Sequence, residues 1–121
     1  MAPEQVVDEF NAAINRRDLA GLAERMSEGH QFVDAENAVL TGKAACLDAW
    51  RGFFEAFPDY RNTFTRLSTT DNVVAVEGFS SCSVPELDGP ALWRSVVADD
   101  RIALWRVYHD TPANRAALGL A

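Results

Sequence analysis

The spacing of the hydrophobic residues changes at Pro58. Before this residue, apolar side chains recur every three or four positions, as they do along one face of a helix. After it, the chain is rich in Val, Thr, Phe, Trp and Tyr, the residue types that favour strands. Turn signals divide this second half at residues 70–72, 85–90 and 99–100. The pattern predicts an antiparallel meander of four long strands, over residues 60–69, 73–83, 91–98 and 101–109.

The first half of the chain contains three segments with apolar residues at helical spacing, and one short strand. Pro3 suits the first turn of a helix, and Asp18 is a good N-cap for a second helix. Pro58 ends a third helix, which carries the densest aromatic stripe in the chain. We predict helices over residues 3–17, 19–26, 43–57 and 112–119, and a break at 28–29 before a short strand over 30–35.

The order helix, helix, strand, helix and then a run of strands is an α+β pattern. The 121 residues fit a single domain, 1–121, and are enough to bury one core. One mixed or antiparallel sheet must bury a face on the three helices of the N-terminal half, and a short C-terminal helix follows. A strongly curved sheet covered in this way forms a cone, whose open end is a natural ligand pocket.

Composition narrows the choice of partners. The formal net charge is −7 and no basic cluster occurs, so we expect no binding to nucleic acid or to anionic membrane. Cys46 and Cys82 have no metal-ligand spacing and are expected to be free thiols in a reducing compartment. We find no signal peptide, no membrane span, no phosphate-binding loop and no metal motif, and we expect a cytoplasmic protein without a cofactor.

Asp34 ends the predicted strand at 30–35 and shares a face with His30 and Phe32, because alternate strand residues point to the same side. In an apolar pocket, desolvation would raise the pKa of Asp34 and make the carboxylate a competent base near neutral pH. The alternative is a partly exposed carboxylate at the end of a strand, hydrogen-bonded to the following loop.

Two further side chains are candidates for proton transfer. Glu77 would form a base and acid pair with Asp34 if its face of the strand at 73–83 lines the pocket. The alternative is a glutamate that faces outward. His30 could shuttle a proton or orient Asp34. Its position after a glycine turn is also typical of a partly solvated histidine.

Short motifs over nearly the whole chain resemble the nuclear transport factor 2-like superfamily. Residues 6–15, 18–21 and Phe32-Val33-Asp34 are similar to the paired helices and the active-site strand of ketosteroid isomerases. Residues 41–43, 57–59 and 101–110 resemble SnoaL-like polyketide cyclases and limonene epoxide hydrolases. The resemblance implies the cone fold and a homodimer formed through the outer face of the sheet. It does not specify a reaction, because one fold hosts many functions.

The resemblance places Asp34 on the general base of the isomerases, but other polar positions of the relatives are changed. Phe10 replaces an oxyanion tyrosine, Trp50 a pocket tyrosine, and Val107 an acid-base aspartate. Trp93 replaces an oxyanion acid or a histidine, and its indole N–H could serve as a donor instead. The arginine and aspartate of the epoxide hydrolases fall near Glu77 and Phe79.

These observations support a cofactor-independent acid/base enzyme of isomerase or cyclase type. Asp34 would abstract a proton from a small apolar carbonyl compound, with Glu77 and His30 as catalytic partners. One alternative is a non-catalytic module that binds a small ligand or dimerises, and another is a hydrolase or dehydratase on the same scaffold. A cone completely filled by aromatic side chains is also possible. The expected pocket wall consists of Phe10, Phe32, Trp50, Phe54, Phe79, Trp93, Trp105 and Val107.

Overall fold

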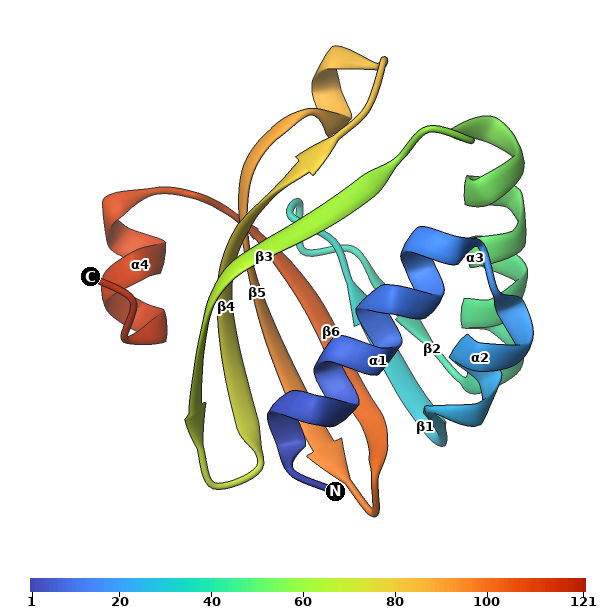
Figure 1. Ribbon diagram of the computed structural model, residues 1–121, viewed down its shortest axis with the longest axis horizontal. Coiled ribbons are helices and arrows are strands. Elements are labelled where there is room, and N and C mark those ends of the chain that lie inside the picture. The colour runs from blue at the N-terminus through green and yellow to red at the C-terminus, as the bar shows by residue number, and fades with distance from the viewer.

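Six strands form one curved sheet in the order β2-β1-β6-β5-β4-β3, as the computed structural model of residues 1–121 shows (Figure 1). Neighbouring strands run antiparallel except β1 and β6, which are parallel. The elements in chain order are α1 (Pro3–Arg16), α2 (Leu19–Glu24), β1 (Met26–Val33), β2 (Val39–Thr41), α3 (Lys43–Ala56), β3 (Arg61–Thr70), β4 (Val73–Ser81), the short 3-10 helix η1 (Pro85–Leu87), β5 (Gly89–Ala98), β6 (Arg101–His109) and α4 (Pro112–Leu118). The sequence therefore predicts the α+β class, the meander and all four helices correctly.

Interruptions in the strand pairing accompany the curvature of the sheet. The register shifts between Met26 and Gln31, between Phe64 and Arg66, and between Val96 and Val97. An extra residue on one strand bends that strand and increases its twist. Close to the second shift, Gly78 lies so near Thr63 that a Cβ atom would collide with the Thr63 carbonyl oxygen. The bend at this point thus depends on glycine.

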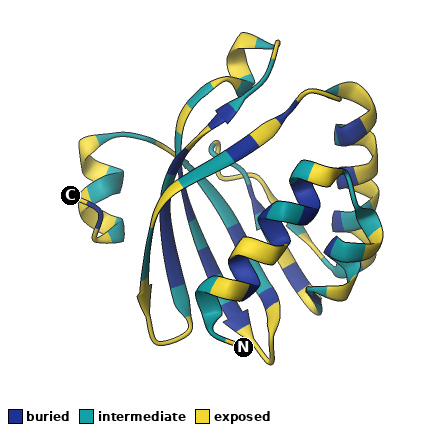
Figure 2. Cartoon of the chain, in the orientation of Figure 1, coloured by how far each residue is buried: buried dark blue, intermediate teal, exposed yellow.

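The main core lies between the concave face of the sheet and α1, which crosses that face (Figure 1). Figure 2 shows buried residues in α1 and along the central strands. The side chains of Phe10 and Ile14 on α1 are fully buried, as are Trp93 and Trp105 on the sheet. A smaller cluster of Ala75, Leu92 and Leu120 lies on the opposite face, which α4 covers (Figure 1). The outer face of the central strands is therefore buried where α4 and Leu120 cover it.

The structure corrects the predicted boundaries in two places. Residues 28–29 do not break a helix but lie within β1, which begins at Met26 and departs from regular pairing with β6 there. β2 was not predicted, because it has only three residues and is mostly exposed. It pairs with Gln31–Val33 and brings the chain back to the start of α3. Both errors fall next to Asp34, which connects β1 to the loop before β2.

Candidate active site

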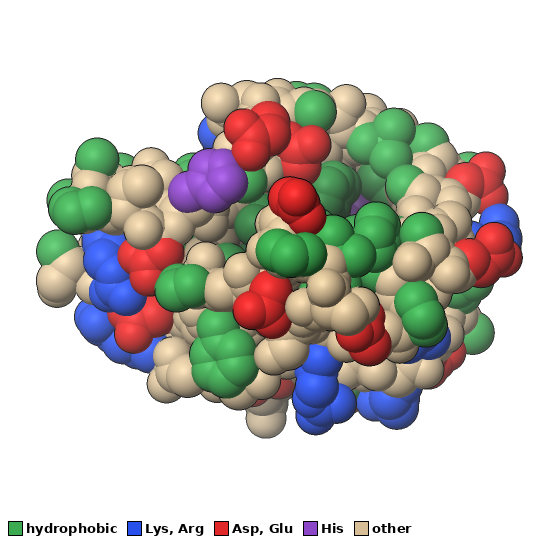
Figure 3. Space-filling model, turned by 90° about the horizontal axis from the view of Figure 1, so that it is seen from above, with side chains coloured by type: hydrophobic (Ala, Val, Ile, Leu, Met, Phe, Trp, Pro, Cys, Tyr) green, Lys and Arg blue, Asp and Glu red, His purple; other side chains and the backbone are tan.

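A cavity of about 460 Å³ opens between the end of β1, α3, β6 and the loop that carries η1. Figure 3 shows the opening as a hollow with hydrophobic side chains in its depth and Asp or Glu side chains around it. The volume is typical of a small-molecule site. The aromatic side chains that line the cavity are Phe32, Trp50, Phe53, Tyr60, Trp105, Tyr108 and His109. The cone is therefore not filled by its own aromatic residues.

Asp34 lies in the wall of this cavity, directly after β1. Its Oδ1 atom accepts hydrogen bonds from the backbone N–H groups of Glu36 and Ala38, both at 2.9 Å. The loop is closed by a bond from the Asp34 N–H to the Ala38 carbonyl oxygen at 3.0 Å. No protein donor reaches Oδ2. Asp34 thus has the geometry of the second alternative, a carboxylate at the end of a strand that is hydrogen-bonded to the following loop, and it also lies in the cavity wall.

A second polar group in the cavity wall comes from Tyr60 and Ser80. The Tyr60 hydroxyl lies 3.2 Å from Ser80 Oγ, and Ser80 Oγ donates to Asn62 Oδ1 at 2.8 Å. Because Ser80 has a single hydroxyl proton, Tyr60 donates to Ser80 in this chain. Burial raises the pKa of Tyr60, which therefore keeps its proton at neutral pH.

Tyr60 and Ser80 were not predicted from the sequence as residues of the cavity wall. Ser80 shares its face of β4 with Val74 and Val76, which lie in the main core. This alternation could have indicated that Ser80 points toward the concave side of the sheet. The hypothesis of an Asp34 and Glu77 pair instead requires the opposite face of β4 to line the pocket. Tyr60 immediately precedes β3 and offered no periodic signal.

Four of the eight expected wall residues line the cavity: Phe32, Trp50, Trp105 and Val107. Phe32 and Trp50 meet edge to face, with ring centroids 5.8 Å apart. Such a contact between strand and helix holds both rings in fixed positions. Leu40, Phe53 and Leu87 are further apolar residues of the wall that were not predicted.

Phe10, Phe54 and Trp93 do not line the cavity, which corrects their assignment as ligand contacts. The ring of Phe10 packs 4.8 Å from Trp105 in the core. Trp93 packs 4.9 Å from Phe64, and its indole N–H has no partner. All three side chains belong to the main core, Phe10 from α1, Phe54 from α3 and Trp93 from β5.

His30 is completely buried and does not line the cavity, so neither a role as a proton shuttle nor partial solvation fits its position. Its Nδ1 lies 2.7 Å from the carbonyl oxygen of Ile102, which requires a proton on Nδ1. Its Nε2 has no hydrogen-bond partner. Desolvation lowers the pKa of His30, so the ring is neutral in the folded protein.

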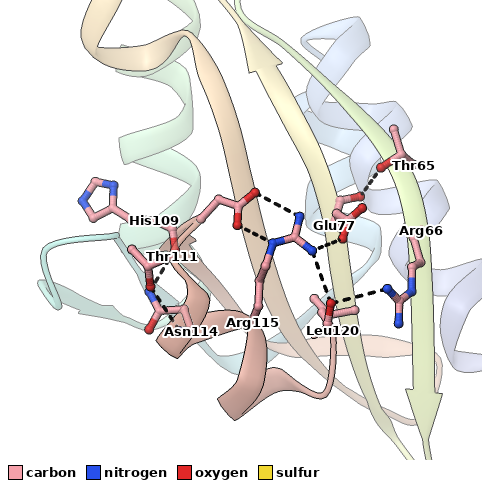
Figure 4. A network of polar contacts seen from close by, with 9 residues as sticks. Thr65, Arg66, Glu77, His109, Thr111, Asn114, Arg115 and Leu120 are labelled. Carbon is pink, nitrogen blue, oxygen red and sulfur yellow. Dashed lines mark hydrogen bonds and ion pairs between the residues drawn. The ribbon is translucent and has the colours of Figure 1, made fainter.

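Glu77 lies on the outer face of the sheet, beside Arg115 of α4 (Figure 4). Phe79 shares that face of β4 by strand alternation and is 42% exposed, and neither residue lines the cavity. Glu77 Oε1 accepts a hydrogen bond from Arg115 Nη1 of α4 at 2.5 Å. Arg115 also forms a two-point ion pair with Asp110, at 2.7 and 3.1 Å. The strand alternation that turns Ser80 inward turns Glu77 outward. The expected base and acid pair of Asp34 and Glu77 is therefore not formed.

No helix is long and apolar enough to cross a membrane. No three His, Cys, Asp or Glu side chains lie in an arrangement that could hold a metal ion.

Residues 7–115 match the family model described as SnoaL-like domain, and the chain belongs to this family. The fold with its cavity at the open end of the cone agrees with that membership. No curated protein matches the chain by sequence.

Solved structures from several organisms share the fold at low identity. IdmH of Streptomyces antibioticus, described as a proposed polyketide cyclase, is 20% identical with a TM-score of 0.75, covering 98% of this chain and 99% of that one. A proposed polyketide cyclase from Sinorhizobium meliloti is 18% identical, with a TM-score of 0.77 and coverage of 88% and 99%. An epoxide hydrolase from M. tuberculosis is 17% identical, with a TM-score of 0.79 and coverage of 89% and 82%. At these identities the likeness establishes the fold.

Proposed function

We propose that this protein is a cofactor-independent acid/base enzyme that acts on a small apolar carbonyl compound. The observation that carries the proposal is the Asp34 carboxylate. One oxygen is fixed by two backbone N–H groups and the other is free at an aromatic cavity. An ionised carboxylate is the better acceptor for these N–H groups, and an ionised carboxylate is what a general base requires.

In the proposed reaction, Asp34 Oδ2 removes a proton from the carbon next to the substrate carbonyl. The electron pair of the C–H bond forms a carbon–carbon double bond, and the π pair of the carbonyl moves to its oxygen, which gives an enolate. The Tyr60 hydroxyl lines the same cavity and can turn from Ser80 to donate a hydrogen bond to that oxygen. Return of the proton to another carbon gives isomerisation, and attack of the enolate carbon on a second carbonyl of the substrate gives ring closure.

Exchange of α-protons for deuterium tests the proton-abstraction step without knowledge of the natural substrate. Small cyclic enones and tetralones are incubated with the protein in D₂O, and the α-proton signals are followed by NMR. We expect wild-type protein to accelerate exchange of at least one ketone, and Asp34→Asn to lower that rate by about 10²–10⁴-fold. Tyr60→Phe should lower it by about 10²-fold or more, because one donor to the oxyanion is lost.

The matched control is Asp48→Asn, which removes a carboxylate from the exposed face of α3 outside the cavity. This variant should exchange at the wild-type rate. An equal rate in wild type and Asp34→Asn, with both proteins folded, would refute Asp34 as the base.

A non-catalytic module that binds a small ligand is the second candidate. It is favoured by Val107, an apolar residue in the cavity wall where the resembling cyclases carry an acid-base aspartate. In that case ketones would bind to the cavity, and neither wild type nor Asp34→Asn would exchange their α-protons. Binding and exchange measured on the same ketones separate the two functions.

We also propose a homodimer through the outer sheet face, which rests on the resemblance. α4 covers part of that face, since Leu120 packs on Ala75 and Leu92. A second copy would therefore use the uncovered part, where Phe79 is 42% exposed. Light scattering should give a dimer for wild type and a monomer for Phe79→Glu, and a wild-type monomer would contradict the proposal.

A further inference from the structure

The charged side chains that line the cavity are all acidic. They are the carboxylates of Asp34, Glu36, Glu86 and Asp88, and none of the residues that line the cavity is lysine or arginine. The chain as a whole has 11 lysine and arginine residues, and all of them lie outside the cavity wall. Figure 3 shows the Lys and Arg side chains on this side of the molecule away from the hollow.

These carboxylates come from two loops on opposite sides of the opening. Asp34 and Glu36 belong to the loop between β1 and β2, and Glu86 and Asp88 belong to the loop between β4 and β5. Glu36 and Glu86 are exposed, whereas the aromatic wall lies deeper in the cavity and includes the buried rings of Trp50 and Trp105. The exposed acidic side chains of Glu36 and Glu86 therefore lie closer to solvent than the aromatic rings of the same cavity.

His109 is the one side chain in the wall that could offset this charge. Its Nε2 lies 2.8 Å from Glu36 Oε1. A protonated His109 would cancel at most the charge of Glu36, and the other three carboxylates would remain. The cavity is thus negative in either protonation state of the histidine.

We infer that the cavity selects ligands by charge, with Glu36 and Glu86 as specificity-determining residues that admit neutral or cationic apolar molecules and reject anionic ones. The ligand class is an aromatic or polycyclic body that fills about 460 Å³ or less and carries an uncharged or protonated-amine group toward the opening. Free carboxylates and phosphate-bearing conjugates are excluded. The inference rests on the cavity being the ligand site of the proposed function, and it is independent of proton abstraction by Asp34.

The aromatic rings in the cavity wall favour ligands that carry a protonated amine. Phe32, Trp50 and Trp105 line the same cavity, and the faces of aromatic rings attract cations. The independent observations of an aromatic cavity and an acidic opening therefore indicate the same ligand chemistry.

Three probes with one body and three charges test the inference. They are 1-naphthylmethylammonium, 1-naphthalenemethanol and 1-naphthoate, which share the naphthalene ring and differ in the charge of the head group. Each is titrated as a competitor of the neutral fluorophore N-phenyl-1-naphthylamine, at low salt and near pH 8, where a free histidine is neutral. In wild type we expect the cation to bind about tenfold or more tightly than the anion, because several exposed charges act together at low ionic strength.

The double substitution Glu36→Gln and Glu86→Gln should reduce the cation-to-anion ratio by about tenfold, mainly through tighter binding of 1-naphthoate. High salt should reduce the wild-type ratio in the same direction. The matched control is Asp48→Asn, which removes an exposed carboxylate of α3 outside the cavity and should leave the ratio unchanged. Circular dichroism checks that each variant is folded. If the double variant is unfolded, the single variant Glu86→Gln is used in its place.

Equal binding of the cation and the anion to wild type would overturn the inference, as would a ratio that the glutamate substitutions do not change. A failure of every probe, including the fluorophore, would also overturn it, because no ligand would then enter the cavity. Charge selection without α-proton exchange would instead leave this inference standing and refute the proposed reaction. Exchange of α-protons without charge selection would refute this inference and leave the proposed reaction standing.

Discussion

The stability of the folded protein should fall on acidification below pH 6.5 because of His30. The ring is completely buried, its Nδ1 is bonded to the Ile102 carbonyl oxygen and its Nε2 has no partner, so protonation would place an unpaired charge in the core. The pKa of His30 is lowered in the folded state, and the unfolded chain therefore binds more protons below about pH 6.5. Stability from this group is complete above that pH and is lost as the pH falls, until the folded-state pKa is reached.

The size of the effect follows from this linkage. At one pH unit below an unfolded-state pKa of about 6.5, the unfolded chain gains about 1.4 kcal/mol by protonating a histidine that stays neutral in the folded protein. We therefore expect the free energy of unfolding to decrease by about 1.4 kcal/mol between pH 8 and pH 5.5 on account of His30. For a domain of this size that is a substantial fraction of the total stability.

Urea denaturation at a series of pH values measures the effect. The chain has two histidines, so His109→Gln is a matched control that should keep the pH dependence, while His30→Gln should lose most of it. In wild type, the imidazole NMR signals of His30 should show no protonation shift around the pH of about 6.5 at which a free histidine titrates. A pH dependence that is the same with and without His30, or a His30 signal that titrates near pH 6.5, would refute the reasoning.

Two substitutions test the fold itself, both read as the free energy of unfolding in urea. Gly78→Ala should destabilise by about 1–3 kcal/mol, because its Cβ would collide with the Thr63 carbonyl oxygen. Gly52→Ala on α3, where an added Cβ atom has no neighbour within 4 Å, should instead stabilise the protein by about 0.5–1 kcal/mol. If both alanine variants changed the free energy of unfolding in the same direction, the collision at Gly78 would not be the cause. Leu120→Ala should cost about 2–5 kcal/mol, since Leu120 is fully buried against Ala75 and Leu92 on the outer face; a loss below 1 kcal/mol would mean that the segment after α4 is not anchored there.

The helices and the meander were predictable because each has one dominant period. The stripe on α1 meets a sheet on one side only, and the turns at 71–72 and 99–100 separate strands that pair with their neighbours in sequence. β2 was not predicted because its three mostly exposed residues are too few to show an alternation of apolar and polar side chains. Gly29 resembled a helix break, although it lies within β1 where the pairing with β6 is irregular.

The error at Glu77 has a different physical origin. β4 carries Val73 and Ala75 on one face and Val74 and Val76 on the other, so its alternation does not distinguish inside from outside. Both faces are covered, by α1 on the concave side and by α4 with Leu120 on the other. Only the tertiary structure decides which face meets the cavity. Asp34, at the end of a strand, was predictable because its neighbours in the sequence set its position.

The placement of Phe10 and Trp93 explains why the cavity lies near the acidic opening. In the resembling isomerases these positions hold polar groups, but here both side chains are fully buried and pack between α1 and the sheet. They fill the deep end of the cone, and the remaining space lies between Asp34, Tyr60 and the loop that carries η1. A ligand bound there has its reactive group close to the carboxylates at the opening. Under the proposed function, the residues that select a ligand by charge therefore lie in the same cavity wall as the base, so one group of carboxylates serves both ligand selection and proton transfer.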